Sequence, residues 1–523
     1  MGMVIENTFA ELIYGLIFIF WAIYVYFVKD YGYWEERGVP HVPPVFPFGS
    51  TVRNVWNRCY RGITYDQIYR DFRDERFVGL IDIRNPSLLV RDPELIGHIL
   101  EKDFSNFTDH TMVDPNPAEY LLNHLYNLKG QEWRDMRHKL APAYTAAKVK
   151  MMFCLVQRCS ADLRKAFTKL TSNNSVVNVK DCMSRFTMDV IATCVYGVEI
   201  NSLENVDSEF CLMGRKSNEV SVVMLLKMYL MNAFPIFKKI HCFNYMDSDV
   251  TEFFTRTIRS AVEYRESQSV ERFDFLDLLI KLRRNQSILE EGEKSPDLPG
   301  SSTLRKREGL TIEEITAQTF AFFAAGYETT ANTIMFCLYE LACDNRIQDK
   351  LSWEVKEVLG RHGGDISYQA LQEMSYMEQV IKESLRRYPI LPYLTRTCSG
   401  NYKLPNSNVE IQTGHQVVIP VYSLHHDPNY FPEPFTFNPE RFSHSSNLHP
   451  HVYLPFGEGP RMCIGKQFGL TSVKTALASL VSDYKISLAP GTDVPLKLKN
   501  NPFTTLPSKP LMLVFTRRNA TVQ

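Results

Sequence analysis

An uninterrupted apolar run near the amino terminus is the clearest hydrophobic pattern in the chain. It covers Leu12–Val28 without a charged residue, follows Glu11, and precedes Lys29 and Arg37. About 17 residues is the short end of the lengths that span a bilayer. A buried helix of a soluble protein would show the same run, whereas a cleavable signal would need a positively charged start. The positive charges after the run predict a membrane helix whose carboxyl-terminal side faces the cytoplasm.

A second long apolar pattern begins after Thr311-Ile-Glu-Glu314, which is a capping-box sequence, and continues to about Cys343. At 1.5 Å per residue, this helix would span roughly 45 Å, enough to cross a domain. The run Ala324–Thr330 departs from the pattern. Gly326 should cost about 1 kcal/mol inside a helix, and an acid and two hydroxyls add a cost if they are buried. Departures of this kind often mark a functional site.

Shorter patterns complete the expected fold. Two apolar segments rich in β-branched and aromatic residues predict short strands, and three further segments show helical periodicity. The expected strands are Phe77–Ile83 and Ser87–Val90, and the expected helices cover Asp162–Asn244, Tyr376–Tyr388 and Lys466–Ser482. The sequence therefore predicts a mainly α protein with a small β part.

Composition excludes some classes of function. The chain has 523 residues, is 45% hydrophobic and has a formal net charge of -1, so it can bury a large core and shows no bias toward nucleic acid. Its 11 cysteines are odd in number and irregularly spaced, which does not resemble a disulfide framework. They suit a reducing compartment.

The strongest chemical signal is Cys463, in the loop Phe456–Gly465 before the last predicted helix. Glycines at 457, 459 and 465 allow left-handed angles and the close approach of a large flat object. Backbone amides and the helix start should lower the pKa of the thiol, and Arg461 adds a positive charge. Such a thiolate could be a nucleophile, a zinc ligand or a haem-iron ligand. No second zinc ligand is nearby, but the partners of a nucleophile could be distant.

The residues of this loop resemble the haem-binding signature of the cytochrome P-450 superfamily. The matching positions are Phe456, Gly459, Arg461, Cys463 and Gly465. The resemblance covers about residues 30 to 516, and several short segments look like the insect microsomal group associated with hormone and foreign-compound metabolism. It implies a helix-rich triangular domain, with haem between the long central helix and the cysteine loop. The implied organisation is a membrane anchor at 1–29, a proline-rich hinge at 30–50 and a haem-thiolate monooxygenase domain at 51–523.

The resemblance also implies roles for residues outside the loop. Glu328 and Thr329 match the pair that delivers protons to dioxygen, beside Ala325 and Gly326, which leave room for a ligand. Glu383 and Arg386 are three apart, which alone predicts only a surface ion pair. The remaining implied roles are haem-propionate contacts at Trp133, Arg137 and Arg396, and a buried charge network of Glu383, Arg386 and Arg441 that supports the cysteine loop.

The implied activity is monooxygenation by haem b (iron protoporphyrin IX), with Cys463 as the axial iron ligand. One atom of O2 would enter an apolar small molecule, such as a xenobiotic, an insecticide or a hormone-like or lipid-like compound. We find no dinucleotide-binding fingerprint, so electrons must come from a partner. In membrane-bound relatives that partner is the NADPH-dependent reductase with FAD and FMN, sometimes aided by cytochrome b5. The expected location is the endoplasmic reticulum membrane, with the catalytic domain facing the cytosol.

Alternatives remain at this point. A peroxide isomerase would use the same haem without oxygen insertion, although the intact Glu328–Thr329 pair argues against it, and a haem-bearing sensor would consume no NADPH. Lys148 lies in a basic neighbourhood that predicts either a solvated face or a docking surface for an acidic partner. Gln467 stands where the family commonly has Arg. His425-His426-Asp427 suggests a metal site, but without a third ligand a solvent-exposed loop is the expectation.

Overall fold

The computed structural model describes residues 2–50, 61–110, 119–172, 176–240, 244–286, 309–443, 448–499, 501 and 503–518. Most of these residues are helical, and the strands form small sheets. The prediction of a mainly α fold with a small β part is confirmed.

The bounds of the elements are as follows. The α-helices are α1 Gly2–Val28, α3 Arg61–Asp71, α4 Pro93–Gly97, α5 Gly130–Leu140, α6 Ala146–Thr171, α7 Val179–Ile191, α8 Glu209–Asn218, α9 Val222–Ala233, α10 Ser248–Gln268, α11 Phe275–Arg283, α12 Ile312–Cys343, α13 Asn345–Arg361, α14 Tyr368–Glu373, α15 Ser375–Arg387, α16 Val421–His425 and α17 Lys466–Val481. The strands are β1 Phe77–Asp82, β2 Asn85–Val90, β3 Val176–Asn178, β4 Leu394–Thr397, β5 Tyr402–Lys403, β6 Glu410–Ile411, β7 Gln416–Ile419, β8 Tyr484–Leu488 and β9 Met512–Arg517.

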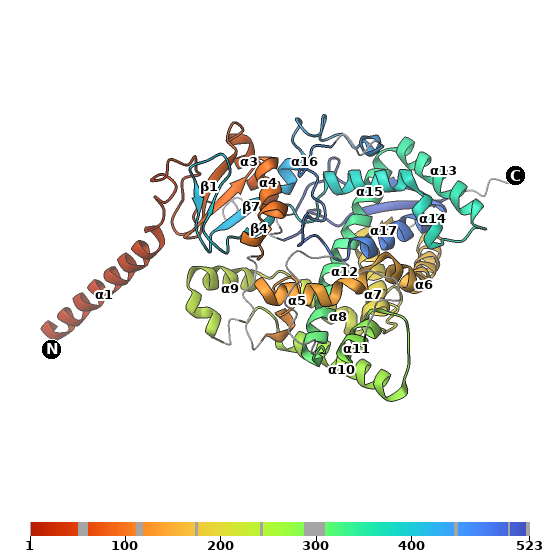
Figure 1. The fold of residues 1–523 in the computed structure, drawn as a ribbon, viewed down its shortest axis with the longest axis horizontal. Helices are drawn as coiled ribbons and strands as arrows, with labels where there is room; N and C mark the ends of the chain where they lie inside the picture. Colours follow the sequence, from red (N-terminus) through yellow and green to blue (C-terminus); the bar gives the residue numbers. More distant parts are fainter. Residues whose placement is uncertain are drawn as a thin grey trace.

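The long helix α12 passes through the middle of the body (Figure 1). It begins with the predicted capping box, because Thr311 Oγ1 accepts a hydrogen bond from the Glu314 amide at 3.1 Å and Glu314 Oε2 accepts one from the Thr311 amide at 2.8 Å. It ends at Cys343, as predicted. Helices α7, α10, α15 and α17 pack around it. Its residues are buried over most of its length, so α12 forms the shared wall of two hydrophobic clusters.

The larger sheet lies at the end of the body next to α1 (Figure 1). Its strand order is β1-β2-β7-β4, with β2 and β7 parallel and the other pairs antiparallel. The two strands predicted near Phe77 and Ser87 are therefore confirmed as β1 and β2. A second sheet, β3-β9-β8, joins residues of the middle of the chain to the carboxyl-terminal segment.

The helix α1 projects away from the body (Figure 1). Its segment Ala10–Val28 is long and apolar enough to cross a membrane, by length and composition. The following residues pack on the sheet: Trp34 is fully buried, and its indole N–H donates to the Leu80 carbonyl at 2.8 Å. A Cβ on Gly79 would lie 2.5 Å from the Trp34 ring, which explains the glycine there. The hinge at 30–50 stays a prediction.

Two expectations differ from the structure. The segment Asp162–Asn244 is not helical throughout, because Val176–Asn178 forms strand β3 and pairs with β9. The segment His425-His426-Asp427 is not a solvent-exposed loop, because all three residues are buried. Tyr69 donates its hydroxyl to Asp427 Oδ2 at 2.7 Å, so this segment is tied into the core. The described residues contain no group of His, Cys, Asp and Glu that could hold a metal ion.

Candidate functional site

The cysteine loop is a tight turn whose shape depends on two glycines. Gly457 and Gly459 have φ angles of 69° and 71°, a region in which L side chains are strained. A Cβ on Gly459 would also collide with the Leu100 carbonyl oxygen. The Cys463 amide donates to the Phe456 carbonyl at 2.9 Å, which closes the turn directly before α17. Phe456 itself is partly buried against the core.

Two opposing effects act on the pKa of the Cys463 thiol. The residue has accessible surface of its own but lies deep in the protein, and this burial raises the pKa of the thiol. A hydrogen bond from the Gly465 amide and the positive charges of Arg137 and Lys466 act in the opposite direction. The sequence predicted a lowered pKa. In the protein alone the predicted amide contact is present, but burial outweighs it.

The residues of the run Ala324–Thr330 on α12 contact different neighbouring helices. Thr329 Oγ1 donates to the Ala325 carbonyl one turn back, and the surfaces of both residues remain partly open. Gly326 faces another way: a Cβ there would lie 2.6 Å from Ile191 Cδ1 of α7. The glycine therefore allows α7 to approach α12, rather than only leaving room for a ligand. Thr330 lies against α17, because a Cβ on Gly469 would be 3.9 Å from its hydroxyl.

Glu328 is held by a residue that the sequence analysis did not identify. Lys180 of α7 places its Nζ 2.9 Å from Glu328 Oε1 and 2.8 Å from Asn332 Oδ1. The two acceptors are four residues apart, so they share the face of α12 that meets α7. The one signal in the sequence was a lysine in the first turn of a helix, where the helix dipole disfavours a cation.

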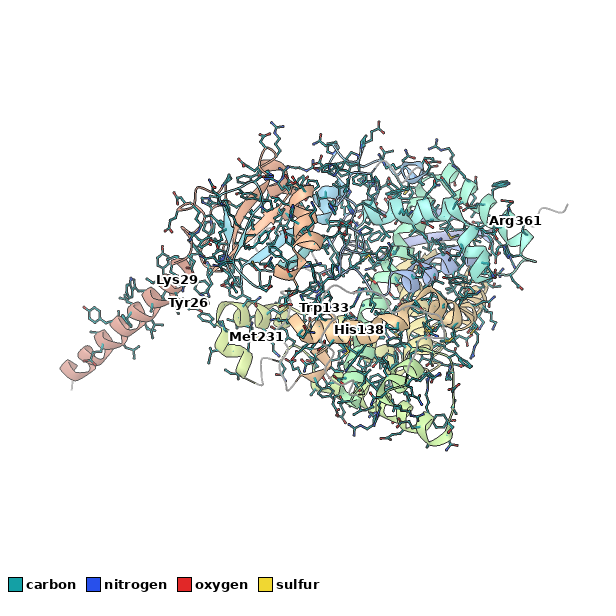
Figure 2. The ribbon with its side chains drawn as sticks, viewed as in Figure 1. Tyr26, Lys29, Trp133, His138, Met231 and Arg361 are labelled. Carbon is teal, nitrogen blue, oxygen red and sulfur yellow. The ribbon has the colours of Figure 1, made fainter. Side chains whose placement is uncertain are left out.

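Arg461 mainly holds the segment before α5 in place through hydrogen bonds to its backbone. Its guanidinium donates to the carbonyls of Thr108 at 2.7 Å and Leu128 at 2.6 Å, and also to those of Leu125 and Tyr126. It lies 4.2 Å from the centre of the Trp133 ring and 3.7 Å from Asp109 Oδ1. Residues 111–118 of this segment lie outside the described residues. Figure 2 shows Trp133 near the middle of the body, on α5.

Two further arginines have few partners. Arg396 is buried, donates one hydrogen bond to the Thr395 carbonyl at 2.8 Å, and has no partner for Nε among the described residues. Burial lowers its pKa to about 10. Burial and the nearby Arg396 lower the pKa of Arg461 to about 9, and burial also lowers that of Arg137. Neither Arg137 nor Arg396 forms an ion pair within the described part of the chain.

The residues of the predicted charge network lie together, because Glu383 contacts both Arg386 and Arg441. Arg386 and Glu383 are both fully buried, and Arg386 Nε and Nη2 donate to the two Glu383 carboxylate oxygens at 2.8 and 2.9 Å. Arg441 Nε lies 3.3 Å from Glu383 Oε1, which also accepts from the Asn438 amide at 2.9 Å. Arg386 donates further to the carbonyls of His425 and Pro434 at 2.8 Å each. The pair is therefore buried and fully bonded, unlike a surface ion pair.

Comparison with known proteins agrees with this geometry. Residues 46–515 match the family model of cytochrome P450. The chain is 36% identical to cytochrome P450 6a2 of Drosophila melanogaster, over 93% of this chain and 95% of that protein. It is 33% identical to cytochrome P450 6j1 of Blattella germanica, over 98% and 99%, and 34% identical to cytochrome P450 6A1 of Musca domestica, over 94% and 95%. The chain belongs to the cytochrome P450 family, and it is a monooxygenase.

The family implies haem, and the residues of this chain fit that group. Haem carries two carboxylates, and Arg137 and Arg396 are guanidinium groups that lack an acidic partner among the described residues. A Cβ on Gly465 would meet no protein atom within 4 Å, so the backbone there is open to a flat ligand. A thiolate is a suitable axial ligand for haem iron. The chemistry of these residues therefore fits haem: a thiolate for the iron and two guanidinium groups for the carboxylates.

Proposed function

We propose that this protein is a membrane-bound haem-thiolate monooxygenase that takes electrons from NADPH through a flavin-containing reductase. It inserts one oxygen atom into an apolar small molecule: RH + O2 + NADPH + H+ gives ROH + H2O + NADP+. The class of substrate is a foreign compound, such as an insecticide, or a hormone-like or lipid-like molecule. The observation that carries the proposal is the position of Cys463, with the Gly465 amide on its sulfur and Arg137, which has no acidic partner among the described residues, close by.

The residues divide the work as follows. Cys463 would supply the thiolate ligand of the haem iron, and Arg137, Arg396 and Trp133 would hold the carboxylates of the cofactor. The bound haem supplies the oxygen chemistry, and its thiolate ligation favours cleavage of the O–O bond. The Thr329 hydroxyl donates its proton to the Ala325 carbonyl, so its oxygen is left to accept a hydrogen bond from water. Thr329 therefore positions water at the open turn of α12. Glu328 brings protons to that water from the solvent side.

Two apolar surfaces support the membrane location. Beside α1, exposed apolar side chains lie on α9 and just after it: Val222, Val223, Leu225, Leu226 and Ile236. The base of α1 contacts this region, because the Tyr26 hydroxyl donates to the Ala233 carbonyl at 2.9 Å and the Tyr26 ring stacks on Phe234 at 5.5 Å. Figure 2 shows Tyr26 and Lys29 at the base of α1, near Met231 of α9. A membrane that holds α1 would therefore also contact α9, with the body on the cytosolic side of the endoplasmic reticulum.

The reductase would approach the side of the cysteine loop. Arg134 and Lys139 of α5 are partly exposed and Lys150 of α6 is exposed, so they offer charge to an acidic partner, with cytochrome b5 as a second candidate. Lys148, expected in the same surface, is buried and does not contribute. Gln467 uses its amide to donate to the Tyr368 hydroxyl at 3.2 Å, so this position adds no charge to the surface.

The carbon monoxide difference spectrum of the dithionite-reduced membrane fraction tests the proposal. We expect the red-shifted band of a thiolate-ligated haem in the wild-type protein and in Cys154→Ser, whose cysteine is exposed on α6. Cys463→His should keep haem but give a band typical of histidine ligation. A histidine-type band from folded wild-type protein, or a thiolate band in Cys463→His, would refute the ligand. With reductase present, absence of NADPH consumption would favour a sensor.

A further inference from the structure

The body of the protein contacts α1 within the last turn of its apolar segment. The segment Ala10–Val28 has 19 residues, so at 1.5 Å per residue it is about 28 Å long, close to the hydrocarbon thickness of about 30 Å in a bilayer. Its side chains are exposed from Leu12 to Val25, but Tyr26 is partly buried and Phe27 is 3% exposed. The last two residues therefore mark the level at which the hydrocarbon layer ends and the phosphate groups of the lipids begin.

The turn between β1 and β2 meets α1 at this level. Ile83 and Arg84 lie between the two strands, and Ile83 belongs to the same small hydrophobic cluster as Phe27. The φ angle of Ile83 is 59°, which a β-branched residue rarely adopts. The turn keeps this strained residue beside the anchor helix, and the next residue, Arg84, lies against Tyr26 of α1.

The charge of Arg84 is balanced by no ion pair within the described part of the chain. Its guanidinium carbon lies 4.6 Å from the centre of the Tyr26 ring, and its Nε is buried without a hydrogen-bond partner among the described residues. Arg76, directly before β1, differs from it, because the Arg76 Nε lies 2.6 Å from Asp92 Oδ2. A guanidinium placed beside a ring, without an acid, favours an anion from outside the chain.

Phosphate is the anion that a bilayer supplies at this level. The planar fork of N–H donors on a guanidinium matches two oxygens of a phosphate group. Lys29 follows the apolar segment and shares a helix face with Tyr26, three residues earlier. Its side chain is 53% exposed and its Nζ is 3.7 Å from Asp30 Oδ2, so the ammonium keeps donors for a second contact. Figure 2 shows Lys29 and Tyr26 together at the base of α1.

We propose that Arg84, assisted by Lys29, binds the phosphate group of a phospholipid at the base of α1. The inference rests on the proposed membrane location of the protein. Tyr26 is also tied to the end of α9, through its hydrogen bond to the Ala233 carbonyl and its stacking on Phe234. A lipid held by Arg84 therefore stabilises α9 in its position against the anchor helix.

The test compares the full-length protein in bilayers of phosphatidylcholine and of digalactosyldiacylglycerol. Neither lipid has a net charge and only the first carries phosphate, so the comparison isolates the phosphate group. The measurement is amide hydrogen exchange in α9, followed by mass spectrometry. In the wild-type protein we expect exchange to be about fivefold slower in phosphatidylcholine. Arg84→Gln should lose this difference, whereas Arg84→Lys, which keeps the charge, should retain part of it.

Arg361→Gln is the matched control, because Arg361 is an exposed arginine at the far edge of the body (Figure 2). It removes one positive charge and should retain the whole difference between the bilayers. Inorganic phosphate, added to the wild-type protein in digalactosyldiacylglycerol, should not slow the exchange. If it does, the site binds free phosphate, and the assignment to a phospholipid is overturned.

Two outcomes separate failure of the inference from failure of the proposed location. Equal exchange of the wild-type protein in the two bilayers, or a full difference in folded Arg84→Gln, would overturn the inference alone. Release of the wild-type protein from membranes by a carbonate wash would overturn the membrane location, and the inference with it. If circular dichroism shows that Arg84→Gln is unfolded, Arg84→Met takes its place, because its apolar stem still covers the Tyr26 ring.

Discussion

Two groups of buried or partly buried arginines in this protein have opposite surroundings. The closed network consists of Glu383, Arg386 and Arg441, in which a fully buried carboxylate accepts from both arginines. The open cluster consists of Arg137, Arg396 and Arg461, for which the nearest acid in an ion pair is Asp109, 3.7 Å from Arg461. The closed network is complete within the chain. Among the described residues, the open cluster has more positive than negative charge, and an anionic ligand would balance the difference.

The pKa values of two arginines in the open cluster are consistent with its positive charge. In the open cluster, burial and mutual repulsion lower the pKa of Arg461 to about 9, and burial lowers that of Arg396 to about 10. A guanidinium whose pKa falls this far is disfavoured in its charged form by its surroundings. Proteins rarely retain such an arrangement for stability alone. We therefore propose that the closed network serves folding, whereas Arg137 and Arg396 of the open cluster serve the cofactor.

Removing Glu383 should have the largest effect. In Glu383→Ala, Arg386 would remain fully buried without its carboxylate, at a cost of about 3–5 kcal/mol. We expect little or no haem-loaded protein, measured as the carbon monoxide band per total protein. The matched control is Lys350→Ala, which breaks the exposed pair with Glu440 at 2.8 Å and should cost at most about 1 kcal/mol. Normal haem loading in Glu383→Ala would show that the closed network does not support the fold.

Acid should lower the stability of the protein through the buried histidines beside the closed network. His425 is joined to Arg386, because its Nδ1 lies 3.2 Å from the Arg386 carbonyl, and burial holds its pKa well below the usual value. Burial lowers the pKa of the adjacent His426 to about 3, against about 6.5 in an unfolded chain. Unfolded protein therefore binds more protons between these values, and stability is lost as the pH falls from about 6.5 toward 3.

For His426 alone, this loss should reach about 2 kcal/mol at pH 5 relative to pH 7.5. His426→Phe keeps a ring beside Tyr422. It should therefore reduce the pH dependence of the free energy of unfolding, measured in guanidinium, by that amount. His449→Phe, which replaces a histidine at an exposed position, is the matched control. Equal pH dependence in wild type and His426→Phe would mean that this histidine is not neutral in the folded protein.

The sequence predicted some of these features well, for identifiable reasons. The bounds of α12 follow from a local capping box and a continuous apolar run, and both signals lie within the helix itself. The meeting of Glu383 with Arg441 was available only through the family resemblance, because spacing alone suggests a surface pair. The strand Val176–Asn178 was missed, since three residues carry too little periodicity and depend on β9 for pairing.

Contacts between distant segments were the least predictable. Lys180 is 148 positions from Glu328, and a lysine in a helical segment is normally a surface residue. Arg461 was expected at the cofactor, but most of its donors serve carbonyls of the segment 108–128, which no local pattern could show. Gly326 was interpreted as room for a ligand, whereas its missing Cβ also accommodates Ile191. In each case the partner lies on another element.

The open cluster gives the smallest and most specific prediction. Arg396→Met removes a buried charge that has no acidic partner among the described residues, so the fold should lose little stability. Haem should be held less firmly, because one charged hydrogen-bond donor to its carboxylates is gone. We expect haem transfer to excess apomyoglobin to be about tenfold faster, which corresponds to about 1.4 kcal/mol. The exposed Arg361→Met, at the far edge of the body in Figure 2, is the control and should transfer haem at the wild-type rate. If Arg396→Met instead failed to fold, as expected for Glu383→Ala, the distinction between the two groups of arginines would be wrong.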